Sequence, residues 1–397
     1  MGRSRSWWWI PVGVFGLSRV VDAVLLIVLG HQQLAFHDGM GAYVYADKPA
    51  DPGYWSLLTN WDGQWYQEIA SEGYPGELPR DGSGAVVQNA WAFYPLYPAL
   101  ARLVMEALGL SFPVAASLVS LAFGAGAMVV LFDLVRETGG RHTAAVVVLA
   151  LCFYPAAPVL QAAYAESLAL FLILSALWLL RRRRYGAVAV VGVLLSLARP
   201  IVPALAALIL LHGVMRWRGR HREPFPARER VRCLLAALVV GTSFLVWPLA
   251  AAAVTGEIDA YPLTQRAWIL DGSHGWSTWL TALVGLDGVL PVLLVVVAGG
   301  LLLFVVLRPQ AKLWGSDLRA WALLYVLFLL GSARMTSSII RYAMVAVVPW
   351  WPLPEVASQS RLARWSVIGW IVVAGTIGQL CWLRFFFVVT EARVLYP

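Results

Sequence analysis

The sequence predicts an all-α fold, a polytopic bundle of transmembrane helices. Of the 397 residues, 60% are hydrophobic and 13% are charged, whereas soluble domains carry about 25% charged residues. The mean hydropathy of +0.71 agrees with this, and the 20 Trp residues are typical of aromatic anchors at membrane interfaces. At roughly 20 residues a span, the chain holds about 11 spans in one integral-membrane domain over 1–397.

The first predicted span is the apolar run 7–29. It is longer than the apolar core of a signal peptide and has no small-residue cleavage site, so we expect it to remain on the chain. Arg3 and Arg5 precede it. Arg19 and Asp22 lie three residues apart inside it, a spacing that lets the two charges pair on one helix face.

A long outer loop, 31–112, is expected between the first and second spans. Most of it is rich in Asp, Glu, Gly and Pro. Trp61, Trp65 and Ile69 recur at helical spacing, which predicts a helix whose apolar stripe lies on the bilayer surface. The segment 91–110 repeats its apolar residues in the same way but contains Pro and charged residues, so a second interfacial helix is predicted there rather than a span.

Ten further apolar segments complete the predicted bundle, and the basic residues orient it. With the N-terminus in the cytoplasm, the cytoplasmic segments contain 20 of the 30 Lys and Arg residues, as the positive-inside rule requires. The loop 31–112 then faces outward. The further spans are expected near 113–135, 143–161, 163–180, 185–198, 200–215, 233–254, 289–307, 320–332, 342–356 and 366–388.

Five arginines depart from this rule because they lie at or near the outer ends of predicted spans. Each either extends to lipid headgroups or pairs with a nearby acid, or holds an anionic ligand. These residues are Arg199, Arg266, Arg334, Arg341 and Arg384.

Several classes of function are excluded by composition. The net charge of +8 reflects membrane orientation, so no nucleic-acid partner is predicted. The three Cys residues lack CxxC spacing and the six His residues form no HExxH or similar cluster, so we expect no metal site, and no cofactor is predicted. Lys is confined to Lys48 and Lys312, and this bias toward Arg is typical of a GC-rich bacterial genome.

Two carboxylates are candidates for chemistry at the outer face. Asp62 stands at the start of the helix predicted in the outer loop, where it either caps the helix N-terminus or serves as a base that deprotonates an acceptor hydroxyl. Glu166 begins a predicted span from the outside. It either complements the helix dipole or forms a second carboxylate facing the same water layer.

Two aromatic segments also face outward in this topology. The segment 92–98 combines aromatic residues with Pro and is interpreted first as an interfacial anchor with a bend. The loop 255–288 has the mixture of a sugar-contacting surface, because sugar CH faces pack on aromatic rings, and equally that of an interfacial Trp belt. Its residues of interest are Tyr261, Arg266, Trp268, Asp271, His274 and Trp276.

Five motifs occur in a fixed order along most of the chain. They are Trp61-Asp62-Gly63 with Ile69-Ala70 and Gly73-Tyr74; Ala92-Phe93-Tyr94-Pro95-Leu96-Tyr97-Pro98; Tyr164 with Glu166 and Ser167; Ala198-Arg199; and Arg341-Tyr342. In this order they resemble the PIG-V family, the membrane mannosyltransferases that add the second mannose to glycosylphosphatidylinositol anchors, and specifically its bacterial, actinobacterial homologues. The chain departs from the family pattern in two ways: Ala165 stands where Thr is usual, and Arg199-Pro200-Ile201-Val202 lacks the Asn-Gly that commonly lies near the arginine.

The resemblance implies a GT-C glycosyltransferase of the cell membrane whose active site lies on the outer face. It implies transfer of mannose from polyprenyl-phosphate-mannose to a lipid-linked or envelope glycan acceptor, with inversion and without a nucleotide sugar. Asp62 would then be the catalytic base, and Arg199, Arg334 and Arg341 would neutralise the leaving phosphate. Glu166 would orient a hydroxyl or hold an arginine. The remaining substrate-contacting candidates are Trp61, Tyr94, Tyr164 and Tyr342.

Two other classes of function fit a multispan protein with outward arginines. A transporter or flippase of an anionic lipid is one, although we find no internal repeat and no paired broken helices in the hydropathy pattern. A structural membrane subunit is the other, in which Asp62 and Glu166 would only stabilise helix ends.

Overall fold

The computed structural model describes residues 7–37, 43–268, 300, 303–333, 338–346 and 360–390. In these ranges the secondary structure is helical apart from two isolated β-bridges, Phe36 with Lys48 and Arg80 with Val86. The chain forms two compact units. Unit 1 comprises Met1–Ser71, Tyr97–Leu174 and Thr336–Pro397, and unit 2 comprises Glu72–Leu96 and Ser175–Met335.

Unit 1 contains the N-terminal and C-terminal helices and most of the outer loop. Helix α1 packs along α5, and α17 packs against α5 as well. Helix α6 begins in this unit and continues into the other. The elements are α1 (Trp9–Gly30), α2 (Gly53–Leu57), α3 (Asp62–Glu72), α4 (Leu96–Leu108), α5 (Phe112–Cys152), the 3-10 turn η2 (Ala157–Leu160), α6 (Glu166–Arg181), α15 (Ile339–Ala343), η4 (Met344–Ala346), α17 (Arg361–Trp382) and the π-helical turn η6 (Leu383–Phe387).

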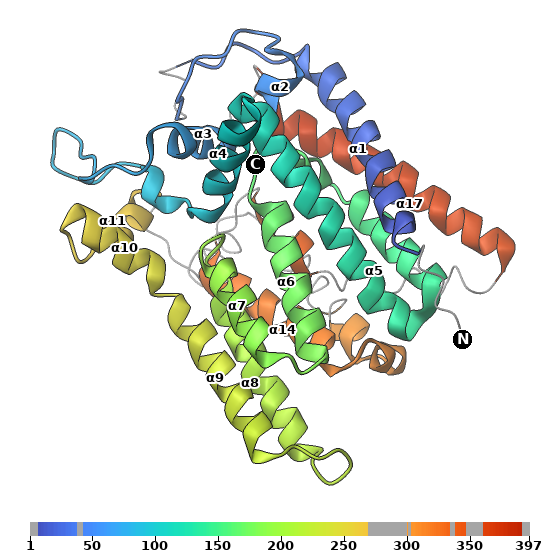
Figure 1. Ribbon diagram of the computed structural model, residues 1–397. Helices are drawn as coiled ribbons and strands as arrows, with labels where there is room; N and C mark the ends of the chain where they lie inside the picture. Colours follow the sequence, from blue (N-terminus) through green and yellow to red (C-terminus); the bar gives the residue numbers. More distant parts are fainter. Residues whose placement is uncertain are drawn as a thin grey trace, which may run out of the picture. The chain divides into compact units, whose positions relative to one another are not determined.

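Unit 2 is built on four neighbouring helices, in which α9 packs against both α7 and α8 and α14 packs against α8 (Figure 1). A second cluster forms around Trp91 and Trp247, whose indole Nε1 donates to the Trp91 carbonyl over 3.0 Å. The elements are η1 (Ala90–Ala92), α7 (Tyr185–Ser196), α8 (Val202–Arg218), α9 (Ala227–Ser243), α10 (Val246–Thr255), α11 (Ala260–Ala267), η3 (Pro309–Trp314) and α14 (Ser316–Ser332).

The described residues contain long apolar helices of the kind that membrane proteins have. Four helical segments are long and apolar enough to cross a bilayer. The predicted total of about 11 spans stays a prediction, because the predicted spans 289–307 and 342–356 lie largely outside the described residues. The four segments are Trp9–Gly30, Phe112–Cys152, Ala227–Thr255 and Arg361–Phe387.

The predicted span 143–161 is wrong as a continuous helix. Helix α5 joins it to the preceding span with a non-helical residue at Gly140, where φ is +80°, and then ends at Cys152. The backbone from 153 to 165 is irregular except for η2. Pro155 and Pro158 explain the break, since proline lacks the amide hydrogen that a helix interior needs.

The carbonyl groups of this irregular segment, and that of Cys152 just before it, are hydrogen-bonded by side chains from several helices. Arg19 donates to the Ala157 carbonyl over 2.6 Å and to the Cys152 carbonyl over 3.1 Å, while it also forms the predicted pair with Asp22, at 2.7 Å. Buried backbone groups require such partners, above all at membrane depth. Further donors include Ser117 to Gln161, Ser120 to Ala162 and Gln379 to Cys152.

The outer loop contains the two helices that the sequence predicts, but their apolar residues face protein. Helix α3 starts at Asp62, and α4 has 13 residues, about 20 Å, which is too short for a span. Trp61, Trp65 and Ile69 are each no more than 6% exposed. The prediction that this stripe lies on the bilayer surface is therefore wrong, because the stripe packs inside unit 1.

The tyrosines of the segment 92–98 are also buried inside the protein rather than exposed as anchors. In unit 1, Tyr97 is fully buried and its hydroxyl donates to the Ala116 carbonyl over 2.9 Å. In unit 2, Tyr94 lies in the Trp91–Trp247 cluster and its hydroxyl is 2.8 Å from that of Tyr261. The motif thus supplies packing to both units.

Candidate active site

Three charged side chains from distant parts of the sequence meet inside unit 1. One guanidinium nitrogen of Arg341, Nη1, donates to Asp62 Oδ2 over 2.8 Å and to Glu166 Oε1 over 2.7 Å. The two carboxylates therefore share a single nitrogen. Asp62 begins α3, Glu166 begins α6 and Arg341 lies in α15.

The residues on either side of Asp62 fix the start of α3. Trp61 has a left-handed backbone, with φ of +57°, which is costly for a residue with a bulky side chain. Its indole Nε1 donates to the Phe387 carbonyl over 2.8 Å. Gly63 lies so close to Ala163 that an added Cβ would be 3.3 Å from the Ala163 Cβ. In the Trp-Asp-Gly motif, Trp61 thus anchors the start of the helix, Asp62 supplies the carboxylate, and Gly63 allows the backbone to approach Ala163 closely.

The start of α6 is tied to the same loop, which places Glu166 opposite Asp62. The Tyr164 hydroxyl donates to the Asn60 carbonyl over 3.1 Å, and the Ala163 amide donates to the Leu58 carbonyl over 2.9 Å. As the first residue of α6, Glu166 also lies where a helix dipole favours a negative charge.

Arg341 is held by aromatic rings and a hydroxyl as well as by the two acids. Its guanidinium carbon lies 4.9 Å from the Tyr164 ring centre and 5.3 Å from that of Tyr342, within the range of cation–π attraction. Nη2 donates to Ser338 Oγ over 3.3 Å. Three of the predicted site residues, Tyr164, Arg341 and Tyr342, are thereby brought together with Asp62 and Glu166.

Exposure separates the two carboxylates. The Asp62 side chain is 26% exposed, whereas those of Glu166 and Arg341 are 1% and 2% exposed. A buried guanidinium requires a charged partner, and Glu166 supplies one away from solvent. Asp62 is the member of this cluster that an incoming hydroxyl can reach. Within the described part of the chain its carboxylate bonds Arg341 and no backbone amide, so it does not act as a helix cap.

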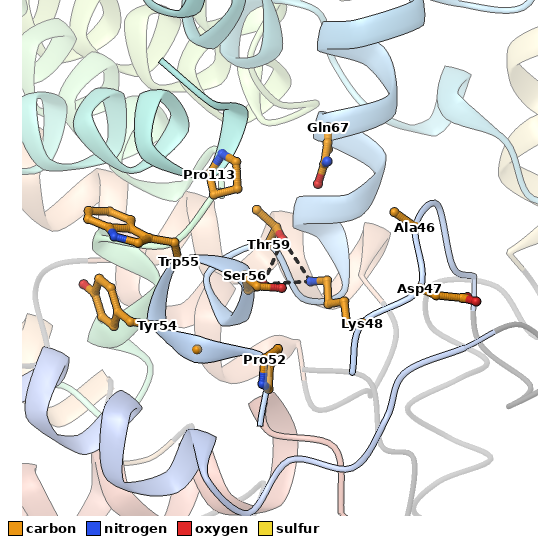
Figure 2. A pocket seen from close by; sticks show the side chains of 11 residues that line it. Ala46, Asp47, Lys48, Pro52, Tyr54, Trp55, Ser56, Thr59, Gln67 and Pro113 are labelled. Atoms are coloured by element: carbon orange, nitrogen blue, oxygen red, sulfur yellow. Dashed lines mark hydrogen bonds between the residues drawn. The ribbon is translucent and has the colours of Figure 1, made fainter. Parts of the chain in front are cut away.

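A buried lysine, which the sequence analysis did not select, fixes the segment that leads into Asp62. Lys48 Nζ donates to the Ser56 carbonyl and to Thr59 Oγ1 over 2.9 Å each (Figure 2). It also donates to Asn60 Oδ1 over 3.0 Å. Burial lowers the pKa of Lys48 from 10.5 to about 7. The signal in the sequence was its rarity, since Lys occurs at two positions of the chain.

Lys48 also lines a cavity of about 410 Å³ within unit 1. Figure 2 shows Tyr54, Trp55 and Gln67 around this space, and Lys48 pointing toward Ser56 and Thr59. Its wall of aromatic and polar side chains lies next to the segment that Lys48 fixes. Lys48 therefore contributes both to the cavity and to the position of the chain before Trp61.

The other predicted site residues lie in unit 2 or outside the described residues. Tyr94 and Arg199 lie in unit 2. Arg334 lies outside the described residues, as do Asp271, His274 and Trp276 of the predicted sugar-contacting loop. Of the other outward arginines, Arg384 donates to Thr390 Oγ1 over 2.8 Å. The residues that the structure describes contain no group of three metal-ligating side chains.

Comparison with known proteins defines the class of fold. No protein-family model and no curated protein sequence matches the chain significantly. The solved structure of ArnT from Cupriavidus metallidurans bound to undecaprenyl phosphate is similar over 94% of this chain and 70% of its own, at 16% identity and a TM-score of 0.53. The oligosaccharyltransferase AglB from Archaeoglobus fulgidus, in complex with an inhibitory peptide and a dolichol-phosphate, is similar over 96% of this chain and 56% of its own, at 13% identity and a TM-score of 0.50.

The fold is therefore similar to the folds of ArnT and of the oligosaccharyltransferase AglB. The chain spans just over half the length of the archaeal enzyme. At these identities the likeness concerns the fold, and the finer resemblance to the PIG-V family stays a prediction.

Proposed function

We propose that this protein is a membrane glycosyltransferase with an inverting mechanism. It transfers a mannosyl residue from polyprenyl-phosphate-mannose to a lipid-linked or envelope glycan acceptor on the outer face of the membrane. The observation that carries the proposal is the shared bond of Arg341 to Asp62 and Glu166, in a chain whose fold is similar to the folds of ArnT and AglB.

Asp62 acts as the general base in this mechanism. As the acceptor oxygen attacks the anomeric carbon, its proton passes to the Asp62 carboxylate, the new C–O bond forms and the bond from carbon to the phosphate oxygen breaks with its electron pair on the phosphate. Its exposure supports this role, since a general base must come within hydrogen-bond reach of the proton that it accepts.

Glu166 and Arg341 position Asp62. Glu166 holds the buried Arg341 guanidinium, and Arg341 in turn orients the Asp62 carboxylate by a charge-assisted hydrogen bond. Neutralising the leaving phosphate stays the role that the sequence analysis predicts for Arg199, Arg334 and Arg341.

The mannose donor rests on the sequence resemblance, and the use of a polyprenyl phosphate is supported by the lipids bound to the two similar structures. ArnT is bound to undecaprenyl phosphate and AglB to a dolichol-phosphate. A long polyprenyl chain also suits a protein rich in apolar helices. These lipids have in common a phosphate on a polyprenyl alcohol, which is the leaving group that the proposed reaction requires.

A transfer assay tests the proposal. Purified protein in lipid is incubated with radiolabelled polyprenyl-phosphate-mannose and a lipid extract of host membranes, beside Asp62→Asn and a control, Asp51→Asn. Asp51 lies in the same outer loop, is half exposed and pairs with His31 at the surface. We expect label to enter a lipid or glycan with the wild type and the control, and transfer by Asp62→Asn to fall at least 100-fold.

Two results would contradict the proposal. If the folded Asp62→Asn variant retained transfer, Asp62 would not be the general base. If the wild type transferred no sugar from polyprenyl-phosphate-mannose or from any other polyprenyl-phosphate sugar, the lipid-transporter function would be favoured instead. Transfer from a different sugar would correct the donor alone.

A further inference from the structure

A groove in unit 2 joins exposed arginines to exposed apolar side chains. It has a volume of about 530 Å³ and lies along α7 and α9. One end is lined by Arg183, Arg184 and Arg232, and the wall continues with Leu235 and Val239. The sequence analysis places these arginines on the cytoplasmic side, away from the proposed active site, so the groove requires an explanation of its own.

Two of the arginines have no side-chain partner among the described residues. Arg184 and Arg232 are exposed and form no hydrogen bond or ion pair with any side chain or carbonyl of the described residues. Arg183 differs, because it pairs with Glu223. Two unpaired guanidinium groups lining one groove create a positive potential suited to an anion, and guanidinium groups bind phosphate oxygens with paired N–H donors.

The apolar wall makes this groove different from a simple anion site. Leu235 is 53% exposed and Val239 is 42% exposed, and they lie one helical turn apart on α9. Gly192 on α7 leaves no room for a side chain beside Val240 of α9, so the two helices are in close contact at this level. An apolar chain lying in the groove would cover Leu235 and Val239.

The base of the groove is rigid. Tyr185 is 2% exposed; its hydroxyl donates to Glu229 Oε1 over 3.0 Å and lies 3.2 Å from His212 Nε2. His212 Nδ1 is in turn 2.9 Å from Asp317 Oδ1. This buried chain of hydrogen bonds links α7, α8, α9 and α14 and fixes the position of the neighbouring arginines.

We propose that this groove binds an anionic phospholipid, with its phosphate between Arg184 and Arg232 and an acyl chain along Leu235 and Val239. Basic pockets between membrane helices on the cytoplasmic side have the chemistry to recognise anionic headgroups. The site is independent of the proposed transferase reaction and requires no catalysis for its test.

Native mass spectrometry of the delipidated full-length protein tests the site. Phosphatidylglycerol and phosphatidylcholine with the same acyl chains are titrated against the wild type, the double variant Arg184→Gln with Arg232→Gln, and a control, Arg222→Gln with Arg228→Gln. The control removes the same charge from two exposed arginines of unit 2 that do not line the groove. Glycerol phosphate, which has the headgroup without the chains, is titrated in parallel.

We expect the wild type and the control to prefer phosphatidylglycerol, and the groove double variant to lose about 30-fold in affinity for it. Val239→Asn should weaken the binding of phosphatidylglycerol and leave the binding of glycerol phosphate unchanged. Equal binding of both lipids, or equal losses in the groove variant and the control, would overturn the proposal. Glycerol phosphate binding as tightly as the lipid would also overturn it, since the site would then be one for a free anion.

Discussion

At the scale of single residues, the arrangement of Glu166, Arg341 and Asp62 separates a partly exposed carboxylate from a buried one. Their difference lies in exposure, which is 1% for Glu166 and 26% for Asp62. The sequence analysis found all three residues but not their bond, because Asp62 and Arg341 are 279 positions apart. Long-range pairing depends on tertiary packing, which a single sequence does not state.

Replacing Arg341 by Met is expected to destabilise the protein by about 3–5 kcal/mol, because it leaves the buried Glu166 carboxylate without its cation. The double variant Arg341→Met with Glu166→Gln should recover part of this loss, since the uncompensated charge is gone. Thermal unfolding of the purified variants in detergent measures both. A double variant that is no more stable than Arg341→Met would contradict the pairing.

The lowered pKa of Lys48 predicts that folding stability depends on pH. Its pKa is about 7 in the folded chain and 10.5 without burial, so between these values the unfolded state holds the extra proton. Folding stability therefore rises with pH from about 7 to 10, by at most about 1.4 kcal/mol per pH unit. We expect the unfolding midpoint of the wild type, relative to Lys48→Met, to increase between pH 7 and pH 9. A difference that stays flat over this range would contradict the depressed pKa.

At the scale of elements, the junction between α3 and the start of α6 determines where the candidate base lies. The two starts touch at Gly63 and Ala163. Helical spacing predicted α3 and its first residue correctly, yet placed its Trp stripe on the bilayer surface. Periodicity identifies an apolar face, but lipid and protein interior are both apolar, so it does not distinguish one from the other.

Gly63→Val is expected to push α3 away from Ala163 and to lower the free energy of unfolding by about 1–3 kcal/mol. It should also reduce transfer, because it displaces Asp62. Gly76→Val is the matched control, because an added Cβ at Gly76 meets no atom within 4 Å. The transfer assay and thermal unfolding, applied to both variants, measure the two effects. Full activity in Gly63→Val would show that this contact does not position the base.

At the scale of the whole molecule, hydropathy predicted a helical membrane protein, and the likeness to ArnT and AglB gives the same class of fold. The break at 153–165 was missed although Pro155 and Pro158 signal it, because the apolar run continues through the break and hydropathy alone does not register a turn. Lys48 was missed because its partners are one backbone carbonyl and two small polar side chains, which form no recognisable sequence motif.

The predicted orientation places the 31–112 loop outside the cell and the Arg-rich 216–232 segment inside it. In a Cys381→Ser background, Cys152 and Cys233 are buried, so a membrane-impermeant maleimide reports on an introduced thiol. We expect Ser83→Cys to be labelled on intact cells, and Arg222→Cys to be labelled after the membrane is opened. Both positions are exposed in the folded chain. The reverse pattern would invert the topology and move the proposed active site to the cytoplasm.

The bonds of Arg19 to the Cys152 and Ala157 carbonyls affect how the chain is made. Synthesis runs from the N-terminus, so α1 enters the membrane before those carbonyls have left the ribosome. During that interval Asp22, 2.7 Å from Arg19 in the folded chain, neutralises the guanidinium within the same helix and lowers the cost of inserting its charge. Asp22 thus offsets the charge of Arg19 during membrane insertion, before the contacts of the folded chain form. Insertion of α1 should therefore become less efficient when Asp22 is replaced by Ala.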